Sequence, residues 1–289
     1  MRVLIIGSGQ MGSGIAQVCI TAGFNTQLLD ISEEIVQKAE KSIENRLLRL
    51  VEKNVFPLQD VHEILSRLSL STDLSTALQH ADIVIECVPE QLELKKEMIK
   101  KIQSIKSTVI IASNTSSLSL EELSIESINP SLIIGMHWFN PPPIMELIEI
   151  VYSKFTSNDV IDIIWKLSMD LGKIPIKVKD SPGFATSRLG VLLGLEAIRM
   201  IEQDIASPEA IDKAMTLGYR HPMGPLELTD YVGLDTRLKI AEYLQSSEIS
   251  PAFEIPELLR IMVKSGKLGK KSGQGFYKWV DGKKVINNE

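Results

Sequence analysis

Short apolar runs alternate with longer amphipathic segments over the first 180 residues of the chain. The runs are rich in Val, Ile and Leu, which is typical of strands buried on both faces of a sheet. They predict strands at 2–6, 26–30, 83–87, 109–112, 132–137, 147–152 and 174–178. Helical spacing of apolar residues predicts helices between them, at 12–23, 33–53, 58–67 and 157–171. The alternation indicates an α/β fold with a Rossmann-like, doubly wound and mostly parallel sheet.

The pattern changes after Asp180-Ser-Pro-Gly-Phe184, where only helical periodicity remains. Helices are predicted at 184–203, from Ser207-Pro208 to about 218, at 226–246 and at 256–265. The stretch 264–275 is dominated by Gly and Lys and predicts a mobile loop. We therefore expect two domains, a Rossmann-like domain over 1–183 and an all-helical C-terminal domain over 184–289. The apolar helices of the second domain are expected to form a wall of the substrate cleft and to make a homodimer.

Composition excludes several classes of function. A formal net charge of −6 argues against a general nucleic-acid binder, because phosphate contacts need clustered Lys and Arg. No apolar run approaches the roughly 20 residues of a membrane-spanning helix, and the chain starts directly with a strand-like run instead of a signal peptide. Cys19, Cys87 and four dispersed histidines show no metal-ligand spacing. We expect a cytoplasmic protein with no metal, nucleic acid or membrane partner.

The first predicted strand leads into Gly7-Ser-Gly-Gln-Met-Gly12, which matches G-x-G-x-x-G before a predicted helix. The first glycine permits a tight turn, the second lets the backbone approach a pyrophosphate, and the third allows the helix to pack closely on the strand. The N–H groups and the positive dipole end of the helix then favour phosphate binding. Strand, loop and helix together predict a dinucleotide site. Its loop residues are Gly7, Gly9, Gln10, Met11 and Gly12.

Asp30 lies at the end of the second predicted strand, 18 residues after Gly12. A carboxylate at this position hydrogen-bonds the adenosine ribose hydroxyls of NAD and repels the 2′-phosphate of NADP. The next residues, Ile31-Ser-Glu-Glu34, include no arginine that would favour that phosphate. The predicted cofactor is therefore NAD(H). The alternative is that Asp30 is a simple turn residue.

The segment 135–150 contains a histidine, His137, and an acid, Glu149, twelve residues later, with three consecutive prolines between them. An imidazole is the usual general base near neutral pH, and a carboxylate can fix its tautomer and stabilise the imidazolium. Beside a dinucleotide site, the pair predicts removal of a hydroxyl proton coupled to hydride transfer. We expect the two side chains to lie within hydrogen-bonding distance and to face the nicotinamide. The run Ser113-Asn-Thr-Ser-Ser117 is either a plain turn or a source of hydroxyls for a substrate oxygen.

Six motifs occur in the same order as in the L-3-hydroxyacyl-CoA dehydrogenases, and the chain resembles that family over nearly its whole length. They are 7–12, Glu86-Cys-Val-Pro-Glu90, 113–117, 137–149, 180–184 and Gly269-Lys-Lys-Ser-Gly-Gln-Gly-Phe-Tyr277. The chain is similar to single-function members, among them the bacterial 3-hydroxybutyryl-CoA dehydrogenases. The resemblance implies reversible oxidation of an L-3-hydroxyacyl-CoA to the 3-oxoacyl-CoA with NAD, and it leaves the acyl chain length open.

The resemblance also implies roles for individual residues of this chain. His137 would be the catalytic base, Glu149 its partner and Ser116 a substrate contact. Contacts to the cofactor are implied for Asp30, Glu90, Lys95, Asn140 and Lys271. Lys53, on the long helix after Asp30, would contact the CoA phosphates.

One position departs from the family pattern. After Pro-Gly-Phe the family reads Ile/Val-Val-Asn-Arg, whereas this chain reads Ala185-Thr-Ser-Arg188, so that Ser187 replaces a substrate-binding asparagine. Serine has one hydroxyl, where asparagine has an acceptor and two donors at longer reach. Ser187 then contacts the substrate through a water molecule, or contacts a substrate that has shifted toward it. Alternatively, Ser187 marks a branch of the family that acts on a different 3-hydroxy acid.

Two other functions remain open from the sequence. One is a dehydrogenase for a free 3-hydroxy acid, for a sugar acid such as gulonate, or for carnitine; Lys53 and Ser187 are the positions where it differs from a CoA enzyme. The other is a non-catalytic structural or NAD-sensing protein. The intact Ser116, His137 and Glu149 argue against the second, because a site without chemistry has no physical reason to keep all three.

Overall fold

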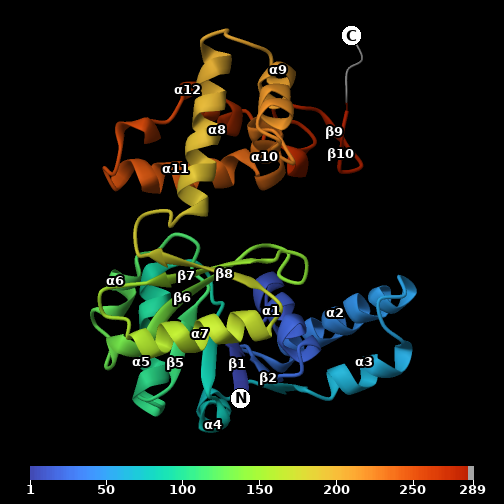
Figure 1. Ribbon diagram of the computed structural model, residues 1–289, viewed down its shortest axis with the longest axis vertical. Coiled ribbons are helices and arrows are strands. Elements are labelled where there is room, and N and C mark those ends of the chain that lie inside the picture. Colours follow the sequence, from blue (N-terminus) through green and yellow to red (C-terminus); the bar gives the residue numbers. More distant parts are fainter. Residues whose placement is uncertain (286–289) are drawn as a thin grey trace. The chain divides into compact units, whose positions relative to one another are not determined.

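The computed structural model describes residues 1–285 and divides the chain into two compact units (Figure 1). The first unit is Met1–Ser181, and the second begins at Pro182, two residues before the start predicted for the second domain. Each unit buries its own cluster of apolar side chains. Within 1–285, no helix is both long enough and apolar enough to span a membrane, and no cluster of His, Cys, Asp and Glu is arranged to hold a metal ion.

The first unit is built on an eight-stranded sheet with the strand order β3-β2-β1-β4-β5-β6-β7-β8. The strands are β1 (Arg2–Ile6), β2 (Asn25–Leu29), β3 (Leu68–Ser71), β4 (Ile83–Glu86), β5 (Ile110–Ser113), β6 (Ile133–Trp138), β7 (Leu147–Tyr152) and β8 (Ile174–Lys179). Neighbouring strands are parallel except β6 and β7, which are antiparallel. The predicted Rossmann-like fold is confirmed. The strand order reverses between β1 and β4, and ligands of such sheets bind at the carboxyl ends of the strands beside that point.

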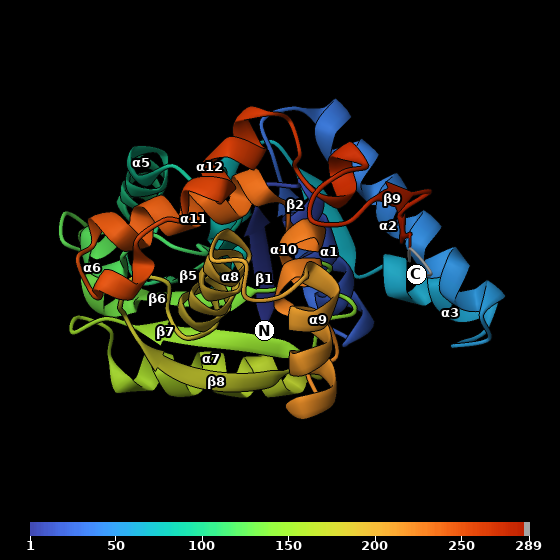
Figure 2. The ribbon, with the colours of Figure 1, turned by 90° about the horizontal axis from the view of Figure 1, so that it is seen from above.

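Helices of the first unit connect and cover these strands. They are α1 (Gln10–Thr21), α2 (Glu33–Glu52), α3 (Leu58–Leu65), α4 (Leu74–His80), α5 (Leu92–Ile105), α6 (Leu120–Ser124) and α7 (Asn158–Asp170), with a 3₁₀ turn η1 (Pro130–Leu132). Ser32 and Ser157 cap α2 and α7 by accepting a backbone N–H with their hydroxyls. Helix α7 packs on β6, β7 and β8 (Figure 2). The short β3 and the helices α4, α5 and α6 are additional to the elements whose bounds were predicted from the sequence.

The second unit is helical, as predicted, with one short β-hairpin in addition (Figure 1). Its elements are α8 (Thr186–Glu202), α9 (Pro208–Lys213), the π-helical η2 (Ala214–Gly218), α10 (Pro225–Val232), α11 (Leu234–Ser246), η3 (Pro251–Phe253), α12 (Glu257–Lys264), η4 (Lys270–Ser272), β9 (Trp279–Val280) and β10 (Lys283–Lys284). The single helix predicted over 226–246 is two helices. Gly233, with a φ of +101°, separates α10 from α11 because a right-handed helix cannot continue through that conformation.

The stretch 264–275, predicted to be a mobile loop, has local hydrogen-bonded structure. The segment contains η4, and Gly269 bridges Gln274. The Leu268 N–H donates to the Ser272 hydroxyl at 2.9 Å. The fully buried carboxylate of Asp230, on α10, accepts hydrogen bonds from the residues that follow this stretch. A Gly- and Lys-rich segment can therefore have a defined conformation when a carboxylate of another helix accepts hydrogen bonds from the backbone beside it.

Candidate active site

Close contacts shape the glycine-rich loop between β1 and α1. Gly7 has a φ of +95°, and its N–H donates to the Leu29 carbonyl at 2.8 Å. A Cβ at Gly12 would lie 1.8 Å from the Gly7 carbonyl oxygen, so only glycine fits there. A Cβ at Gly9 would meet no atom within 4 Å, which leaves the outer side of the loop open. The loop and the first N–H groups of α1 thus form the cradle that a pyrophosphate needs.

Asp30 follows β2, and its carboxylate holds this loop. Oδ2 accepts from the Ser8 backbone N–H at 2.7 Å and from the Ser8 hydroxyl at 2.8 Å, while Oδ1 accepts from the Ile31 N–H at 2.7 Å. Burial alone would raise the pKa of Asp30, but these hydrogen bonds outweigh it and lower the pKa. The carboxylate therefore stays ionised at the end of β2, beside the phosphate cradle.

His137 and Glu149 face each other on β6 and β7. They are direct partners in the antiparallel register, so both side chains project from the same face of the sheet. His137 Nδ1 lies 2.7 Å from Glu149 Oε2, and Glu149 is fully buried. The Phe139 ring packs beside the imidazole, with 4.6 Å between the ring centroids. The predicted pairing is confirmed, and its cause is the strand register, which makes residues twelve apart in sequence direct neighbours across two strands.

A pocket of about 390 Å³ lies beside this pair. It is lined by residues from α1 and from the carboxyl ends of β4, β5 and β6, namely Met11, Cys87, Val88, Glu90, Asn114, Ser116, His137, Trp138, Phe139 and Asn140. Residues predicted for the cofactor and residues predicted for catalysis therefore share one cavity within the first unit.

Side chains of neighbouring elements hold the proline-rich loop after β6, which forms part of the pocket wall. Asn140 Oδ1 accepts from Gln10 Nε2 at 3.1 Å, which connects this loop to the glycine-rich loop. The Lys173 ammonium donates to the carbonyls of Pro142 and Met145 at 2.8 Å each. Proline has no N–H, so contacts of this kind replace the backbone bonds that the loop cannot make.

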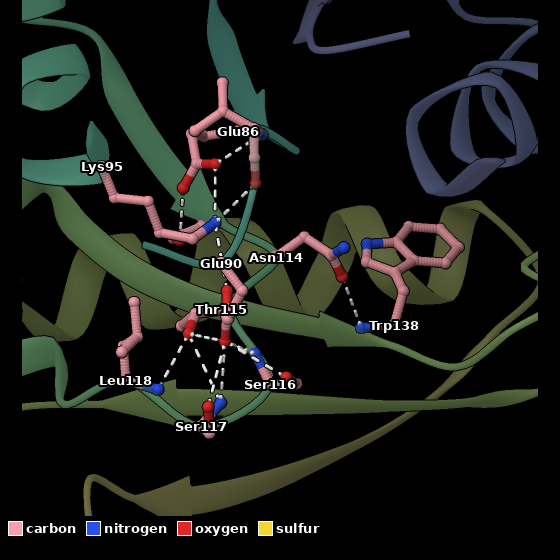
Figure 3. A network of polar contacts seen from close by, with 11 residues as sticks. Glu86, Glu90, Lys95, Asn114, Thr115, Ser116, Ser117, Leu118 and Trp138 are labelled. Carbon is pink, nitrogen blue, oxygen red and sulfur yellow. Dashed lines mark hydrogen bonds and ion pairs between the residues drawn. The ribbon is translucent and has the colours of Figure 1, made fainter. Parts of the chain in front are cut away.

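The carboxylate of Glu90 holds the serine-rich run after β5 (Figure 3). Its Oε1 accepts from the Thr115 hydroxyl at 2.7 Å, and from the backbone N–H and hydroxyl of both Ser116 and Ser117 at 2.7 to 3.2 Å. Behind Glu90, the ammonium of Lys95 contacts protein oxygens, and the side chain is 1% exposed. This burial argues against the direct cofactor contact of Lys95 that the resemblance implied.

Models of one protein family match both units. The model described as "3-hydroxyacyl-CoA dehydrogenase, NAD binding domain" matches residues 2–181, and the model described as "3-hydroxyacyl-CoA dehydrogenase, C-terminal domain" matches 183–279. The chain belongs to the 3-hydroxyacyl-CoA dehydrogenase family. It is therefore an NAD-dependent oxidoreductase, and the open glycine-rich loop and the ionised Asp30 fit NAD as the cofactor.

Relatives resemble the chain over both units. A probable 3-hydroxybutyryl-CoA dehydrogenase of Bacillus subtilis is 41% identical over 281 residues, which are 97% of this chain and 98% of the relative. The mitochondrial hydroxyacyl-coenzyme A dehydrogenase of Sus scrofa is 39% identical over 285 residues, covering 96% of this chain and 91% of the relative. The crystal structure of (S)-3-hydroxybutyryl-CoA dehydrogenase from Ralstonia eutropha matches with a TM-score of 0.93 at 41% identity, covering 97% of this chain and 99% of that one.

Three further residues with predicted contacts to the cofactor or the substrate do not line this pocket. Lys53 is exposed at the C-terminal end of α2. Ser187, in the first turn of α8, is half-buried, and Lys271, in η4, forms an ion pair with Asp235 at 2.5 Å; both belong to the second unit. The roles of all three stay predictions.

No individual role was predicted for Glu86 or Asn114, although each lies in one of the motifs that carry the resemblance. Glu86 is fully buried against Lys95, and Asn114 Oδ1 accepts from the Trp138 N–H at 3.0 Å. The available signal for Glu86 was an acid that ends an otherwise apolar strand, with Lys95 nine residues later on the next helix. Such a pair indicates a buried ion pair only once the strand and the helix are known to pack together.

Proposed function

We propose that the protein reversibly oxidises L-3-hydroxyacyl-CoA thioesters to 3-oxoacyl-CoA with NAD⁺, and that short chains such as 3-hydroxybutyryl-CoA are its substrates. The observation that carries the proposal is the 2.7 Å contact between His137 and the buried Glu149, beside a pocket that also includes Met11 of the dinucleotide loop. The relatives named for 3-hydroxybutyryl-CoA support the short acyl chain.

In the proposed mechanism His137 is the general base. Its Nδ1–H donates to Glu149 Oε2, which fixes the tautomer in which Nε2 carries the lone pair. Nε2 takes the proton of the 3-hydroxyl, and the carboxylate of Glu149 stabilises the positive charge that develops on the ring. NAD⁺, held by the glycine-rich loop and Asp30, would supply the acceptor for the hydride of C3. In the direction of reduction, the imidazolium returns its proton to the 3-oxygen.

The other pocket residues orient the reactants in this proposal. Ser116 lines the pocket, and we assign its hydroxyl to a substrate oxygen. The contact of Ser187 with the substrate stays a prediction from the sequence. Base assistance contributes about 10²- to 10⁴-fold to such reactions. Much of the remaining acceleration comes from holding the reacting atoms in line.

Asp30 is expected to set the choice between NAD and NADP. Asp30→Ala should remove a charged acceptor for the ribose hydroxyls and the repulsion of a 2′-phosphate. The ratio of the Kd values for NADPH and NADH should fall by about tenfold or more, because hydrogen bonds to charged groups contribute about 1.5 to 3 kcal/mol. Fluorescence titration with both nucleotides measures this ratio. An unchanged ratio would leave Asp30 with only its structural contact to Ser8.

A panel of substrates tests the reaction and separates CoA thioesters from free acids. We expect NADH oxidation to be fastest, in kcat/KM, with acetoacetyl-CoA, slower with longer 3-oxoacyl-CoAs and slowest with free acetoacetate. Lys53→Glu should raise KM for acetoacetyl-CoA by about tenfold, or 1.4 kcal/mol, without changing the reaction of free acetoacetate. Lys41→Glu reverses a charge at another exposed position of α2 and is the control. A higher kcat/KM for the free acid would favour the alternative that Ser187 in place of asparagine suggests.

We also propose that the protein forms a homodimer through the second unit. Several large apolar side chains of that unit are exposed, among them Leu217 at 78%, Tyr219 at 75% and Tyr231 at 55%. Covering such side chains with a second copy would bury apolar surface. Light scattering on the purified protein distinguishes one chain from two. A cytoplasmic location stays a prediction.

A further inference from the structure

Glu86 and Lys95 form a buried ion pair next to Glu90, which lines the pocket (Figure 3). Glu86, at the end of β4, is fully buried, and Lys95, on α5, is 1% exposed; Lys95 Nζ lies 2.8 Å from Glu86 Oε1. Glu86 also accepts from the Val88 N–H at 2.7 Å and, with its second oxygen, from the Ser113 hydroxyl at 2.6 Å. The pocket lining includes neither Glu86 nor Lys95. The pair therefore acts on the pocket only through other residues.

The energetics of buried charges make this pair unusual for a purely structural contact. Removing two charges from water costs about as much free energy as their attraction returns, so apolar side chains of similar size often stabilise a fold equally well. The ammonium of Lys95 has a further contact, however. It lies 3.4 Å from Glu90 Oε2, and Glu90 lines the pocket.

Glu90 connects the buried pair to the serine-rich run. Its Oε2 faces Lys95, and its Oε1 accepts the five hydrogen bonds from 115–117. Two of the five come from Ser116, through the backbone N–H at 2.7 Å and the hydroxyl at 3.1 Å. Because donors surround this carboxyl on both oxygens, the arrangement requires the ionised form, which only accepts hydrogen bonds.

We propose that Lys95 is a positioning residue for the reaction. It holds the Glu90 carboxylate in place as an anion, and Glu90 in turn fixes the hydroxyl and the backbone N–H of Ser116 on the pocket wall. Glu86 is the counter-ion that allows Lys95 to be buried at this point. The inference rests on the proposed function, which gives Ser116 its contact with the substrate.

The electrostatics of Glu90 agree with this geometry. Burial acts to raise the pKa of Glu90, but the positive charge of Lys95 and the hydrogen bonds from Thr115 and Ser116 outweigh burial and lower the pKa. Without the charge of Lys95, the pKa of Glu90 should rise. The carboxyl would then take up a proton as the pH falls, loosen its hold on the serine-rich run, and regain that hold as the pH rises.

Other titratable groups surround Glu90. Glu86 pairs with Lys95, and Cys87 and His137 line the same pocket as Glu90. Burial raises the pKa of the Cys87 thiol far above the neutral range. Every variant compared below retains Cys87 and His137, so a displacement between two pH profiles does not come from their removal.

The test compares the wild type with Lys95→Met and with the double variant Glu86→Gln/Lys95→Met. The single variant leaves the buried Glu86 without its cation and should lower the thermal midpoint. The double variant buries no unpaired charge, so its midpoint should recover. Its kcat/KM for acetoacetyl-CoA should still be reduced by about 10²-fold near pH 5.5, the loss expected for a displacement of about 1 Å in the site. The loss should shrink toward pH 8 as Glu90 ionises without assistance.

A control variant on the same helix and a second uncharged double variant complete the comparison with the wild type. Lys100→Met removes a lysine of the same helix that is 48% exposed and paired with Glu126 at 2.6 Å, and it should leave both the midpoint and the pH profile unchanged. The proposal is overturned if the double variant regains the wild-type pH profile together with its stability, because the pair would then be structural only. Glu86→Gln/Lys95→Gln, in which two amides can hydrogen-bond, supplies the same comparison if the first double variant does not fold.

NADH binding separates this inference from the proposed function. The Kd for NADH can be measured by fluorescence between about pH 5.5 and pH 8 without turnover. In the double variant, the pH dependence of this Kd should move to higher pH, because Lys95 no longer lowers the pKa of Glu90. A wild type that binds NADH but does not reduce acetoacetyl-CoA would contradict the proposed function. A double variant with wild-type profiles in both measurements would contradict only the role of Lys95.

Discussion

Replacing His137 by alanine should lower kcat for the reduction of acetoacetyl-CoA by about 10²- to 10⁴-fold, while NADH binding persists. The imidazole is the group that we assign to proton transfer, and it lies outside the glycine-rich loop to which we assign nucleotide binding. Alanine also removes the 2.7 Å hydrogen bond to the buried Glu149, which adds a cost in stability. His137→Asn avoids much of this cost, because its amide N–H lies near the position of Nδ1 and can donate to Glu149. Stopped-flow NADH oxidation and NADH titration measure the two effects.

The partner carboxylate and an exposed histidine supply the controls for this result. Glu149→Gln should reduce kcat by a factor of the same order, because a glutamine amide that donates to Nδ1 favours the tautomer with the proton on Nε2. His62→Ala removes an exposed histidine from α3 and should leave the rate unchanged. Turnover by His137→Asn at the wild-type rate would remove His137 from the mechanism, whatever the effect of the Glu149 variant.

Local patterns were sufficient to predict the parts of the site that short segments build. The three glycines directly follow the apolar run of β1, and the acid after β2 lies 18 residues after the last of them. The structure places all of them as expected. The pairing of His137 with Glu149 was also accessible, because two strands joined by a short loop pair in an antiparallel register. The structure adds the register itself, which a sequence with a proline-rich connection does not specify.

The features that were not predicted depend on contacts between different elements of the fold. Lys95 occurs in a helix with many exposed charges, and its burial depends on Glu86 and Glu90 in the preceding strand and loop. The edge strand β3 reads Leu-Ser-Leu-Ser, which is too short and too polar to distinguish from a turn. In the second unit, the conformation of 264–275 depends on one carboxylate more than thirty residues earlier, which no local pattern reveals.

Replacing that carboxylate, in Asp230→Asn, should destabilise the second unit by about 2 to 5 kcal/mol. Asp230 Oδ1 accepts from the Phe276 N–H at 2.9 Å, and Oδ2 accepts from the Tyr277 N–H and from the Trp279 indole N–H at 2.9 Å each. Asparagine has one acceptor oxygen, so its NH₂ group must face at least one of these buried donors. The segment packs closely on this carboxylate, since a Cβ at Gly275 would lie 2.1 Å from Oδ1.

Differential scanning calorimetry should resolve this loss as a lower melting temperature of the second unit, by on the order of 10 °C, with no change in the first. The matched control is Glu242→Gln, which removes an acid paired with Arg260 at the surface of the same unit, where such pairs contribute about 0 to 1 kcal/mol. Equal melting temperatures for Asp230→Asn and the control would mean that Tyr277 and Trp279 hold the segment through apolar packing alone. A selective loss would instead show that the buried carboxylate of Asp230 fixes the family's Gly- and Lys-rich motif, which has few apolar side chains of its own to do so.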